Sequence, residues 1–380
     1  MVNLVVMKQN KVFLRVMSVL LLCSLFFSCE EKKQDKNVVE KQDAVTDSFT
    51  FWTWTSASEE KEDTAYQEEF AKYSANGITD VLINTGTDPE LLKRIVPFAK
   101  KEGLNVHAWM FTVNRPGDAT AEQHPEWYAV SRNGKSCFDE PPYVGYYKWL
   151  CPTRKESKAH ILSLVEGLAK VEDVASVHLD YIRYSDIFLP IGLLPKYNLE
   201  QEVELPEFDF CYCDVCVAEF EKEHHKNPKE SKNPAIDMEW KQFRLNKVKA
   251  IVDEAYTIAH NNNKILTAAV FPYPEMADHM VRQRWDKWNV DKVLPMIYHN
   301  FYNEEIDWIG YATGQGVKDL KNSNTELHTG IYVPNMSVSD LEKAILLAKD
   351  NGAKGVSIFD GNALTDEQYA VIKKLSKKFN

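Results

Sequence analysis

The stretch Ala-Ser-Val-His-Leu-Asp-Tyr-Ile-Arg-Tyr (175–184) decides the fold of this chain. It begins as a mostly apolar run, which predicts a buried strand, and it becomes polar and aromatic from Asp180 onward. In a barrel of parallel strands the active site lies where the strands end, because the connecting loops converge there over a filled core. A purely structural interpretation stays open, in which Asp180 caps the next turn and pairs with Arg183.

The rest of the chain alternates short apolar runs with longer segments whose apolar residues recur at spacings of three and four. The expected strands are 51–55, 78–84, 105–111, 174–184, 265–271, 293–299, 327–333 and 355–360. The expected helices are 65–73, 89–101, 158–170, 240–260, 276–288, a segment after residue 305, 339–349 and 366–377. Gly77, Gly103 and Gly352 follow three of these helices, where a C-cap glycine belongs. Eight such units predict a closed (βα)8 barrel of the α/β class rather than an open sheet.

Two connections, 112–154 and 185–236, are far longer than the few residues that usually join such elements. Both are expected at the C-terminal face of the barrel, beside Asp180. Aromatic side chains are dense in the first connection, and flat rings with polar tips suit stacking against sugar rings. About half of them are expected to pack the loop onto the barrel instead. These residues are Trp127, Tyr128, Tyr143, Tyr146, Tyr147 and Trp149.

Length and composition favour one large domain over residues 49–380, since this span is ample for a single barrel core. The formal net charge of −11 argues against nucleic acid or anionic lipid as the main partner. Aromatic residues make up 12% of the chain, a level at which some are expected to be exposed in a groove.

Residues 1–28 are expected to be an export signal. Lys8, Lys11 and Arg15 precede an apolar run, 16–27, that is too short to span a membrane. The sequence Leu-Phe-Phe-Ser-Cys (25–29) is similar to a bacterial lipobox, which implies cleavage before Cys29 and its lipidation. Residues 29–48 are charged and poor in large apolar side chains, which predicts a flexible tether. The expected location is the bacterial outer membrane or cell surface, and a buried N-terminal helix is the alternative.

Six short motifs are spread along the predicted barrel. They are His-Leu-Asp-Tyr-Ile-Arg-Tyr (178–184), Cys-Pro-Thr (151–153), Cys-Tyr-Cys-Asp-Val-Cys (211–216), Trp-Lys-Gln-Phe-Arg (240–244), Trp-Asp-Lys-Trp-Asn-Val-Asp (285–291) and Leu-Pro-Met-Ile-Tyr (294–298). This set resembles the glycosyl hydrolase-like family 10 group of bacterial proteins, over residues 51–360. The resemblance implies a (βα)8 barrel that cleaves polysaccharides, and it implies that Asp180 matches the functional aspartate of the fourth strand.

Glycoside hydrolysis usually needs two carboxyl groups, one to protonate the leaving oxygen and one to act as nucleophile or base. Asp180 is the first candidate, and its role stays open. The neighbouring Arg183 would favour the ionised form, whereas burial would raise the pKa and favour an acid. Glu275, which follows the fifth strand, is the second catalytic candidate or else a first-turn residue favoured by the helix dipole. Asp360 ends the eighth strand as a sugar contact or a turn former.

Other polar and aromatic residues at strand ends are expected to contact substrate, although a pocket Trp can equally be a plug of the barrel. His178 should lie one layer deeper than Asp180, as a hydrogen-bonded core residue that orients it rather than as a catalyst. The expected substrate-binding set is Trp52, Trp54, Asn84, Trp109, Arg183, Tyr298, His299, Tyr332, Asn335 and Asp360.

Cys211, Cys213 and Cys216 form a C-x-C-x2-C run near His224 and His225, with spacing suited to a structural zinc ion. A disulfide is the competitor in an exported protein, either within the run or to Cys137 or Cys151, and free thiols are a third alternative. No cofactor is expected for catalysis, because the first strand lacks the paired histidines of metal-dependent barrel hydrolases.

Two functions therefore follow from the sequence. The favoured one is an exported, lipid-anchored glycoside hydrolase with a carbohydrate substrate. The alternative is a surface glycan-binding protein that keeps the barrel and the aromatic groove without turnover. A metal-dependent amidohydrolase on the same fold ranks third, since this barrel supports many chemistries.

Overall fold

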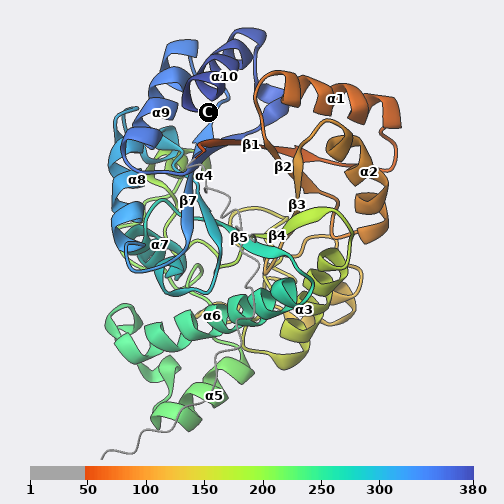
Figure 1. Cartoon of the computed structure of the whole chain (residues 1–380). Helices are drawn as coiled ribbons and strands as arrows, with labels where there is room; N and C mark the ends of the chain where they lie inside the picture. The colour runs from red at the N-terminus through yellow and green to blue at the C-terminus, as the bar shows by residue number, and fades with distance from the viewer. Residues whose placement is uncertain (1–47) are drawn as a thin grey trace, which may run out of the picture. The chain divides into compact units, whose positions relative to one another are not determined.

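The computed structural model describes residues 48–380, in which eight parallel strands close into a barrel in chain order (Figure 1). β1 pairs with both β2 and β8, which closes the ring. The strands are β1 (Thr50–Ser56), β2 (Asp80–Asn84), β3 (Asn105–Phe111), β4 (Val174–Asp180), β5 (Ile265–Val270), β6 (Lys292–Pro295), β7 (Glu326–Tyr332) and β8 (Gly355–Phe359). The predicted (βα)8 fold is confirmed.

Eight of the helices follow the strands one by one and surround the barrel (Figure 1). They are α1 (Asp63–Ala75), α2 (Pro89–Lys101), α3 (Lys155–Ala169), α6 (Met238–Asn261), α7 (Pro274–Val281), α8 (Trp308–Asp319), α9 (Val338–Asp350) and α10 (Asp366–Phe379). Gly77, Gly103 and Gly352 have φ values of 85°, 76° and 94° after three of them. This left-handed backbone costs glycine least, so the predicted C-caps are confirmed.

Three predicted boundaries are wrong for local reasons. β4 stops at Asp180 rather than at residue 184, because Tyr181 turns the chain with a φ of 50°. β6 stops at Pro295 rather than at residue 299, because the Ile297 N–H bonds back to the Pro295 carbonyl at 2.9 Å. α7 stops at Val281 rather than at residue 288, because Arg282 is left-handed with a φ of 52°.

Apolar and aromatic side chains fill the interior of the barrel. Trp52, Trp54, Leu82, Trp109, Ala269 and Leu294 form one buried cluster there, separate from the larger core between strands and helices. Such layers make a barrel solid rather than a pore, so a ligand can enter only at an end.

The two long connections lie side by side on the barrel. The loop after β3 holds the short 3-10 helices η1 (Ala121–Gln123) and η2 (Pro125–Trp127). The loop after β4 holds η3 (Ile191–Leu193), α4 (Leu194–Tyr197), α5 (Asp214–His224), η4 (Pro228–Glu230) and η5 (Pro234–Ile236). A backbone bridge between Ser131 and Phe210 joins the two loops. The Tyr212 N–H strengthens this contact by donating to the Val130 carbonyl at 2.7 Å.

The predicted signal (1–28) with Cys29, and the predicted tether (29–48) except its last residue, lie outside the described residues. Within residues 48–380, no helix combines the length and the apolar character that crossing a membrane requires.

Candidate active site

A cavity of about 380 Å³ opens at the C-terminal ends of the strands, a volume within the range of small-molecule sites. Its walls come from strand ends, from both long loops and from η7 (His299–Tyr302), which follows β6. Most of its lining is aromatic: Trp54, Trp109, Phe111, Tyr146, Tyr147, Tyr181, Tyr197, Phe271, Tyr298, Phe301, Tyr302 and Phe359. The cavity is therefore suited to a ligand with flat apolar faces and polar edges.

Asp180 lies in this cavity as the last residue of β4. Its carboxylate accepts the Tyr181 backbone N–H at 2.7 Å and the Trp109 indole N–H at 3.1 Å. Burial outweighs these two hydrogen bonds and the charge of Arg183, and it raises the pKa of Asp180 from 3.8 to about 6. A carboxyl group with this pKa exists in both protonation states near neutral pH, as an acid/base catalyst requires.

Arg183 points its charge at another carboxylate, that of Asp186. The guanidinium contacts Asp186 Oδ2 at 3.2 Å and the Tyr184 carbonyl at 2.9 Å. It also lies 4.9 Å from the Trp149 ring and 5.0 Å from the Phe271 ring. Arg183 lowers the pKa of Asp180, as its proximity in sequence had suggested, but its ion pair is with Asp186 and burial of Asp180 has the larger effect.

Asp186 is a carboxylate of the cavity that sequence reasoning missed. It is 2% exposed, and with Asp180 it is one of two carboxylates that line the cavity among the described residues. The Tyr143 hydroxyl donates to its backbone carbonyl at 2.8 Å, which ties the loop after β3 to the loop after β4. The signal was present in the sequence as an acid three residues after Arg183, at the start of a long loop.

Five of the predicted site residues line the cavity together. Trp54 and Trp109 meet edge to face with ring centroids 4.8 Å apart, and Tyr298 lies three residues after the end of β6, just before η7. With Asp180 and Arg183 they form the part of the site that the sequence placed correctly.

The other predicted contacts do not line this cavity. Trp52 is 1% exposed and stacks on His107 at 4.0 Å inside the barrel, so it is a plug of the core. Asn84 accepts the Gly86 N–H at 2.8 Å in a turn. Asp360 accepts the Ala363 N–H at 3.1 Å, as expected of a turn former.

The remaining four lie around the mouth or farther from it. Tyr332 packs on Tyr298 at 5.4 Å behind the lining, and His299 begins η7. Asn335 is exposed, with a φ of 64°. Glu275 is exposed in the first turn of α7, where the helix dipole favours a negative charge. This position agrees with the alternative interpretation of Glu275 as a first-turn residue. The structure does not bring Glu275 into the cavity with Asp180.

His178 is a core residue, fully buried one layer below Asp180. Its Nδ1 lies 2.8 Å from the Thr267 hydroxyl, and burial lowers the pKa of the imidazole well below 6.5. The hydrogen bonds that orient Asp180 come instead from Trp109 and the Tyr181 backbone.

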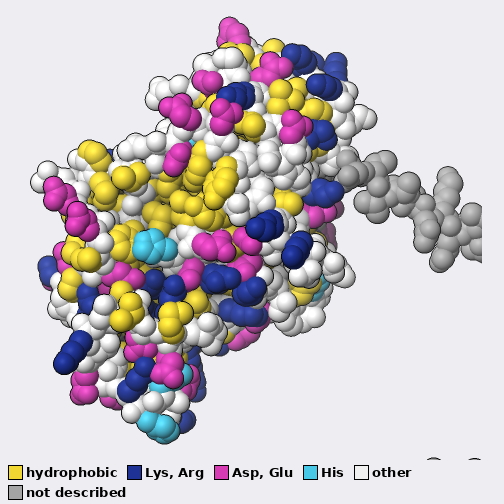
Figure 2. All heavy atoms as spheres, turned by 90° about the vertical axis from the view of Figure 1, so that its left-hand side faces the viewer, with side chains coloured by type: hydrophobic (Ala, Val, Ile, Leu, Met, Phe, Trp, Pro, Cys, Tyr) yellow, Lys and Arg dark blue, Asp and Glu magenta, His cyan; other side chains and the backbone are white. Residues whose placement is uncertain are grey.

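The aromatic residues of the loop after β3 divide as expected. Trp127, Tyr128 and Trp149 are buried against the barrel, whereas Tyr146 and Tyr147 line the cavity and Tyr146 is 50% exposed. On the face drawn in Figure 2, apolar side chains gather in one area, and acidic and basic side chains border it. A large exposed apolar area bordered by polar residues is typical of a binding surface.

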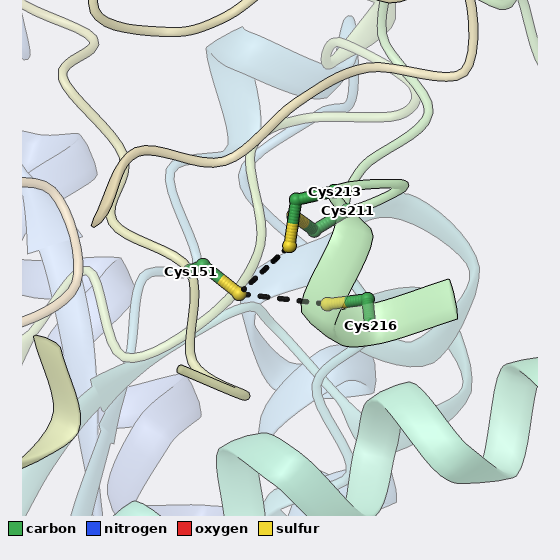
Figure 3. Close-up of side chains that lie close together, drawn as sticks. All are labelled: Cys151, Cys211, Cys213 and Cys216. Carbon is green, nitrogen blue, oxygen red and sulfur yellow. Dashed lines mark hydrogen bonds between the residues drawn. The ribbon is translucent and has the colours of Figure 1, made fainter. Parts of the chain in front are cut away.

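Four buried cysteines form the one cluster in residues 48–380 whose side chains have the arrangement of a metal site. The three predicted ligands Cys211, Cys213 and Cys216 are joined by Cys151 (Figure 3). His224 stacks on Phe220 at 4.5 Å, and neither it nor His225 belongs to the cluster.

Comparison with known proteins agrees with this architecture. Residues 12–190 match the family model described as glycosyl hydrolase-like 10, which confirms the predicted resemblance to this family over that part of the chain. The chain is similar to the catalytic domain of β-amylase from Paenibacillus polymyxa, with 10% identity and a TM-score of 0.64 over 89% of this chain and 100% of that one. It is similar to the PgaB (BpsB) glycoside hydrolase domain from Bordetella bronchiseptica, with 11% identity and a TM-score of 0.63 over 87% and 99%.

A third similar structure is the endo-β-1,4-mannanase from Thermotoga petrophila, with 12% identity and a TM-score of 0.53 over 88% of this chain and 78% of that one. At these identities the likeness shows a shared barrel fold. In the comparison with curated proteins, none matches the sequence.

Proposed function

We propose that this chain, whose residues 12–190 match the glycosyl hydrolase-like 10 family, is a glycoside hydrolase that cleaves a polysaccharide or oligosaccharide. The family match and the barrel shared with glycosidases support a carbohydrate-active protein. The observation that carries the proposal is Asp180. It is a buried carboxyl group in an aromatic cavity at the end of β4, with a pKa raised to about 6.

Asp180 serves in this proposal as the acid/base residue. In its protonated form it gives a proton to the glycosidic oxygen as the bond to the sugar breaks, and the resulting carboxylate takes a proton from water later. The indole N–H of Trp109 and the Tyr181 N–H hold its two oxygens in place for this transfer.

Asp186 is the second carboxylate of the proposed reaction. It lies in the same cavity, where its negative charge stabilises the positive charge that develops on the sugar ring or activates the attacking group. Arg183 fixes its orientation through the 3.2 Å contact. Glu275 remains the candidate predicted from the sequence, but its exposed position on α7 requires a substrate that extends beyond the cavity.

The proposed substrate contacts are the rings of Trp54, Tyr147 and Tyr298 and the half-exposed Tyr146. Stacking on such rings needs no cofactor, and the proposed chemistry uses carboxyl groups alone. The partner is accordingly a carbohydrate, recognised by its flat faces.

One observation favours a glycan-binding protein without turnover as the second candidate. Arg183 engages Asp186, so within the described residues Asp180 is the cavity carboxylate without a cationic partner at ion-pair distance. A binding site would keep the aromatic walls and would not depend on the protonation of Asp180.

Release of reducing sugar from a panel of bacterial, plant and algal polysaccharides tests the proposal. The full chain is compared with Asp180→Asn, Asp186→Asn and Glu275→Gln, each checked for folding by circular dichroism. Hydrolysis that Asp180→Asn and Asp186→Asn abolish and Glu275→Gln retains supports the proposed pair. Binding of a glycan that survives Asp180→Asn, with no sugar released from any substrate, supports the glycan-binding protein instead.

We also propose export and anchoring of the chain through a lipid on Cys29, at the outer membrane or the cell surface. The support is the sequence of residues 1–28, with its basic start, apolar run and Cys29. Labelling of cells with a palmitate analogue should mark the chain, and Cys29→Ser should abolish the label. Equal labelling of the two chains would contradict the anchor.

A further inference from the structure

We propose that Cys151, Cys211, Cys213 and Cys216 bind one structural zinc ion through four thiolates. The site joins the two long loops that carry the walls of the cavity. This inference does not depend on the proposed hydrolase activity, because none of the four cysteines lines the cavity.

The spacing of the sulfur atoms is that of a tetrahedral thiolate site. All four lie within 4.8 Å of one another, and Cys151 Sγ is 3.5 Å from both Cys213 Sγ and Cys216 Sγ. Zinc bound to sulfur at about 2.3 Å in a tetrahedron separates its ligand atoms by about 3.8 Å. Figure 3 shows the side chains of Cys151, Cys213 and Cys216 pointing toward one another.

The same distances argue against disulfides. A disulfide holds two sulfur atoms about 2.05 Å apart and divides four cysteines into two close pairs. Here Cys151 is equally far from two partners, so the arrangement does not select a pair. All four thiols are free in the structure.

The surroundings of the cluster supply hydrogen bonds that thiolates need. The Val130 backbone N–H donates to Cys211 Sγ at 3.3 Å. The Cys216 thiol donates to the Thr153 hydroxyl oxygen at 3.1 Å, and this hydroxyl could donate in return once Cys216 is a thiolate. Cys213 occupies the N-cap position of α5 and Cys216 lies in its first turn, where the helix dipole favours negative charge. Such donors around the ligands orient them and tune the metal.

Tyr184 gives a separate indication. Its hydroxyl is buried and has no hydrogen-bond partner among the described residues. It lies near Cys216, Cys151 and Cys211. An unsatisfied buried hydroxyl is costly, and a metal-bound thiolate would accept its proton as a hydrogen bond.

The cluster is closed to solvent, which suits a structural metal. Cys151, Cys211 and Cys216 are 0% exposed and Cys213 is 5% exposed. Four protein ligands leave no open position for water or substrate, so the ion would not take part in hydrolysis.

The position of the cluster explains what the ion would do. Cys151 ends the loop after β3, which carries Tyr146 and Tyr147, whereas the other three begin α5 in the loop after β4, which carries Asp186. In Figure 1, α5 lies outside the barrel beyond α6, and it packs on α6 through Phe220, whose ring centroid is 4.9 Å from that of Trp240. A metal ion that links the two loops would hold the cavity wall in place, although the ion itself would lie outside the cavity.

Metal analysis and site-specific alkylation of the full chain test the site. Mass spectrometry of the purified protein should find about one zinc ion per chain. Alkylation should spare Cys151, Cys211, Cys213 and Cys216 in the folded protein and reach all four after a chelator is added with mild denaturant. Cys151→Ser should lose the zinc, and Cys137→Ser, which removes a buried thiol outside the cluster, should retain it.

Alkylation of the parent chain keeps the test valid where Cys151→Ser fails to fold. A metal-free protein would overturn the proposal, whether its four cysteines are reactive thiols or disulfides that lower the intact mass by the hydrogens lost. A stoichiometric metal other than zinc would overturn it as well. Zinc in a chain that hydrolyses no glycan would leave this inference standing and would remove only the proposed activity.

Discussion

Asp80 and Asp180 are both nearly inaccessible carboxyl groups on the barrel wall, the first at the beginning of β2 and the second at the end of β4. Burial raises the pKa of each. Asp80 accepts hydrogen bonds from His107 at 2.9 Å, Asn105 at 3.1 Å and Thr79 at 2.6 Å, and these partners lower its pKa below 3.8 overall. Asp180 has two donors and no cation of its own, so its pKa rises to about 6.

The difference in pKa between Asp80 and Asp180 shows that the two ends of the barrel strands serve stability and chemistry separately. At the N-terminal end of the strands the carboxylate is satisfied by its neighbours and holds the barrel together. At the C-terminal end the carboxyl group is left incompletely satisfied, which costs stability and makes proton transfer possible near neutral pH.

The largest expected effect separates the two residues by activity. Asp180→Asn should lower the rate of sugar release by roughly 10²- to 10⁴-fold, because it removes the proton donor but keeps the shape. Asp80→Asn should keep kcat within about twofold, measured at a temperature where both variants are folded. Equal losses in the two variants would erase the comparison.

Asp80→Asn should instead lower the free energy of unfolding by about 1 to 3 kcal/mol. The amide cannot accept all three hydrogen bonds from His107, Asn105 and Thr79, and a buried donor is left unsatisfied. Urea denaturation at pH 7 measures this change. An unchanged midpoint would show that the hydrogen-bond network of Asp80, at the beginning of β2, contributes nothing to stability.

Asp180→Asn should change stability in a way that depends on pH. The amide cannot accept both the Tyr181 and the Trp109 N–H, which gives a loss that is the same at every pH. The folded chain holds the Asp180 proton more tightly than the unfolded chain does, so this contribution to the parent is complete below pH 4 and is lost as the pH rises through about 6. From pH 4 to pH 8 the stability of the variant relative to the parent should therefore rise by between about 1 and 3 kcal/mol, and a constant difference at both pH values would contradict the raised pKa.

The eight-strand order, the C-cap glycines and both long loops could be predicted from the sequence, because each depends on local apolar periodicity or on backbone demands that neighbouring residues set. The boundaries that failed, at Tyr181, Ile297 and Arg282, depend on single turns for which an apolar pattern carries no signal.

The site was harder to predict, because it depends on which side chains meet across distant parts of the chain. Asp180 followed from its place at the end of a strand. Asp186 was missed because its partner Arg183 had been assigned to Asp180. Cys151 became the fourth member of the thiol cluster only through the contact between two loops, 60 residues or more apart in sequence, which spacing cannot reveal.

The smallest expected effect comes from removing the hydrogen bond that Trp109 donates to Asp180. Trp109→Phe removes the indole N–H that lowers the pKa of this carboxyl group while keeping an aromatic ring in the cavity. The inflection in the pH dependence of kcat should therefore move upward by about 0.5 to 1 unit. Since a lost sugar contact would change KM, the pH profile of kcat separates the two roles of Trp109. A downward shift would mean that another group controls the profile.

Titration of Asp180 itself tests whether this carboxyl group has the raised pKa that a proton donor needs. Carbon-13 NMR of the chain labelled at the aspartate carboxyl carbons should show one resonance with a midpoint near pH 6, and Asp180→Asn should remove it. That result would establish a carboxyl group poised for acid/base chemistry at the end of β4. If the resonance lost in Asp180→Asn has a midpoint at or below 3.8, burial does not govern this carboxyl group, and its proposed role as the proton donor fails.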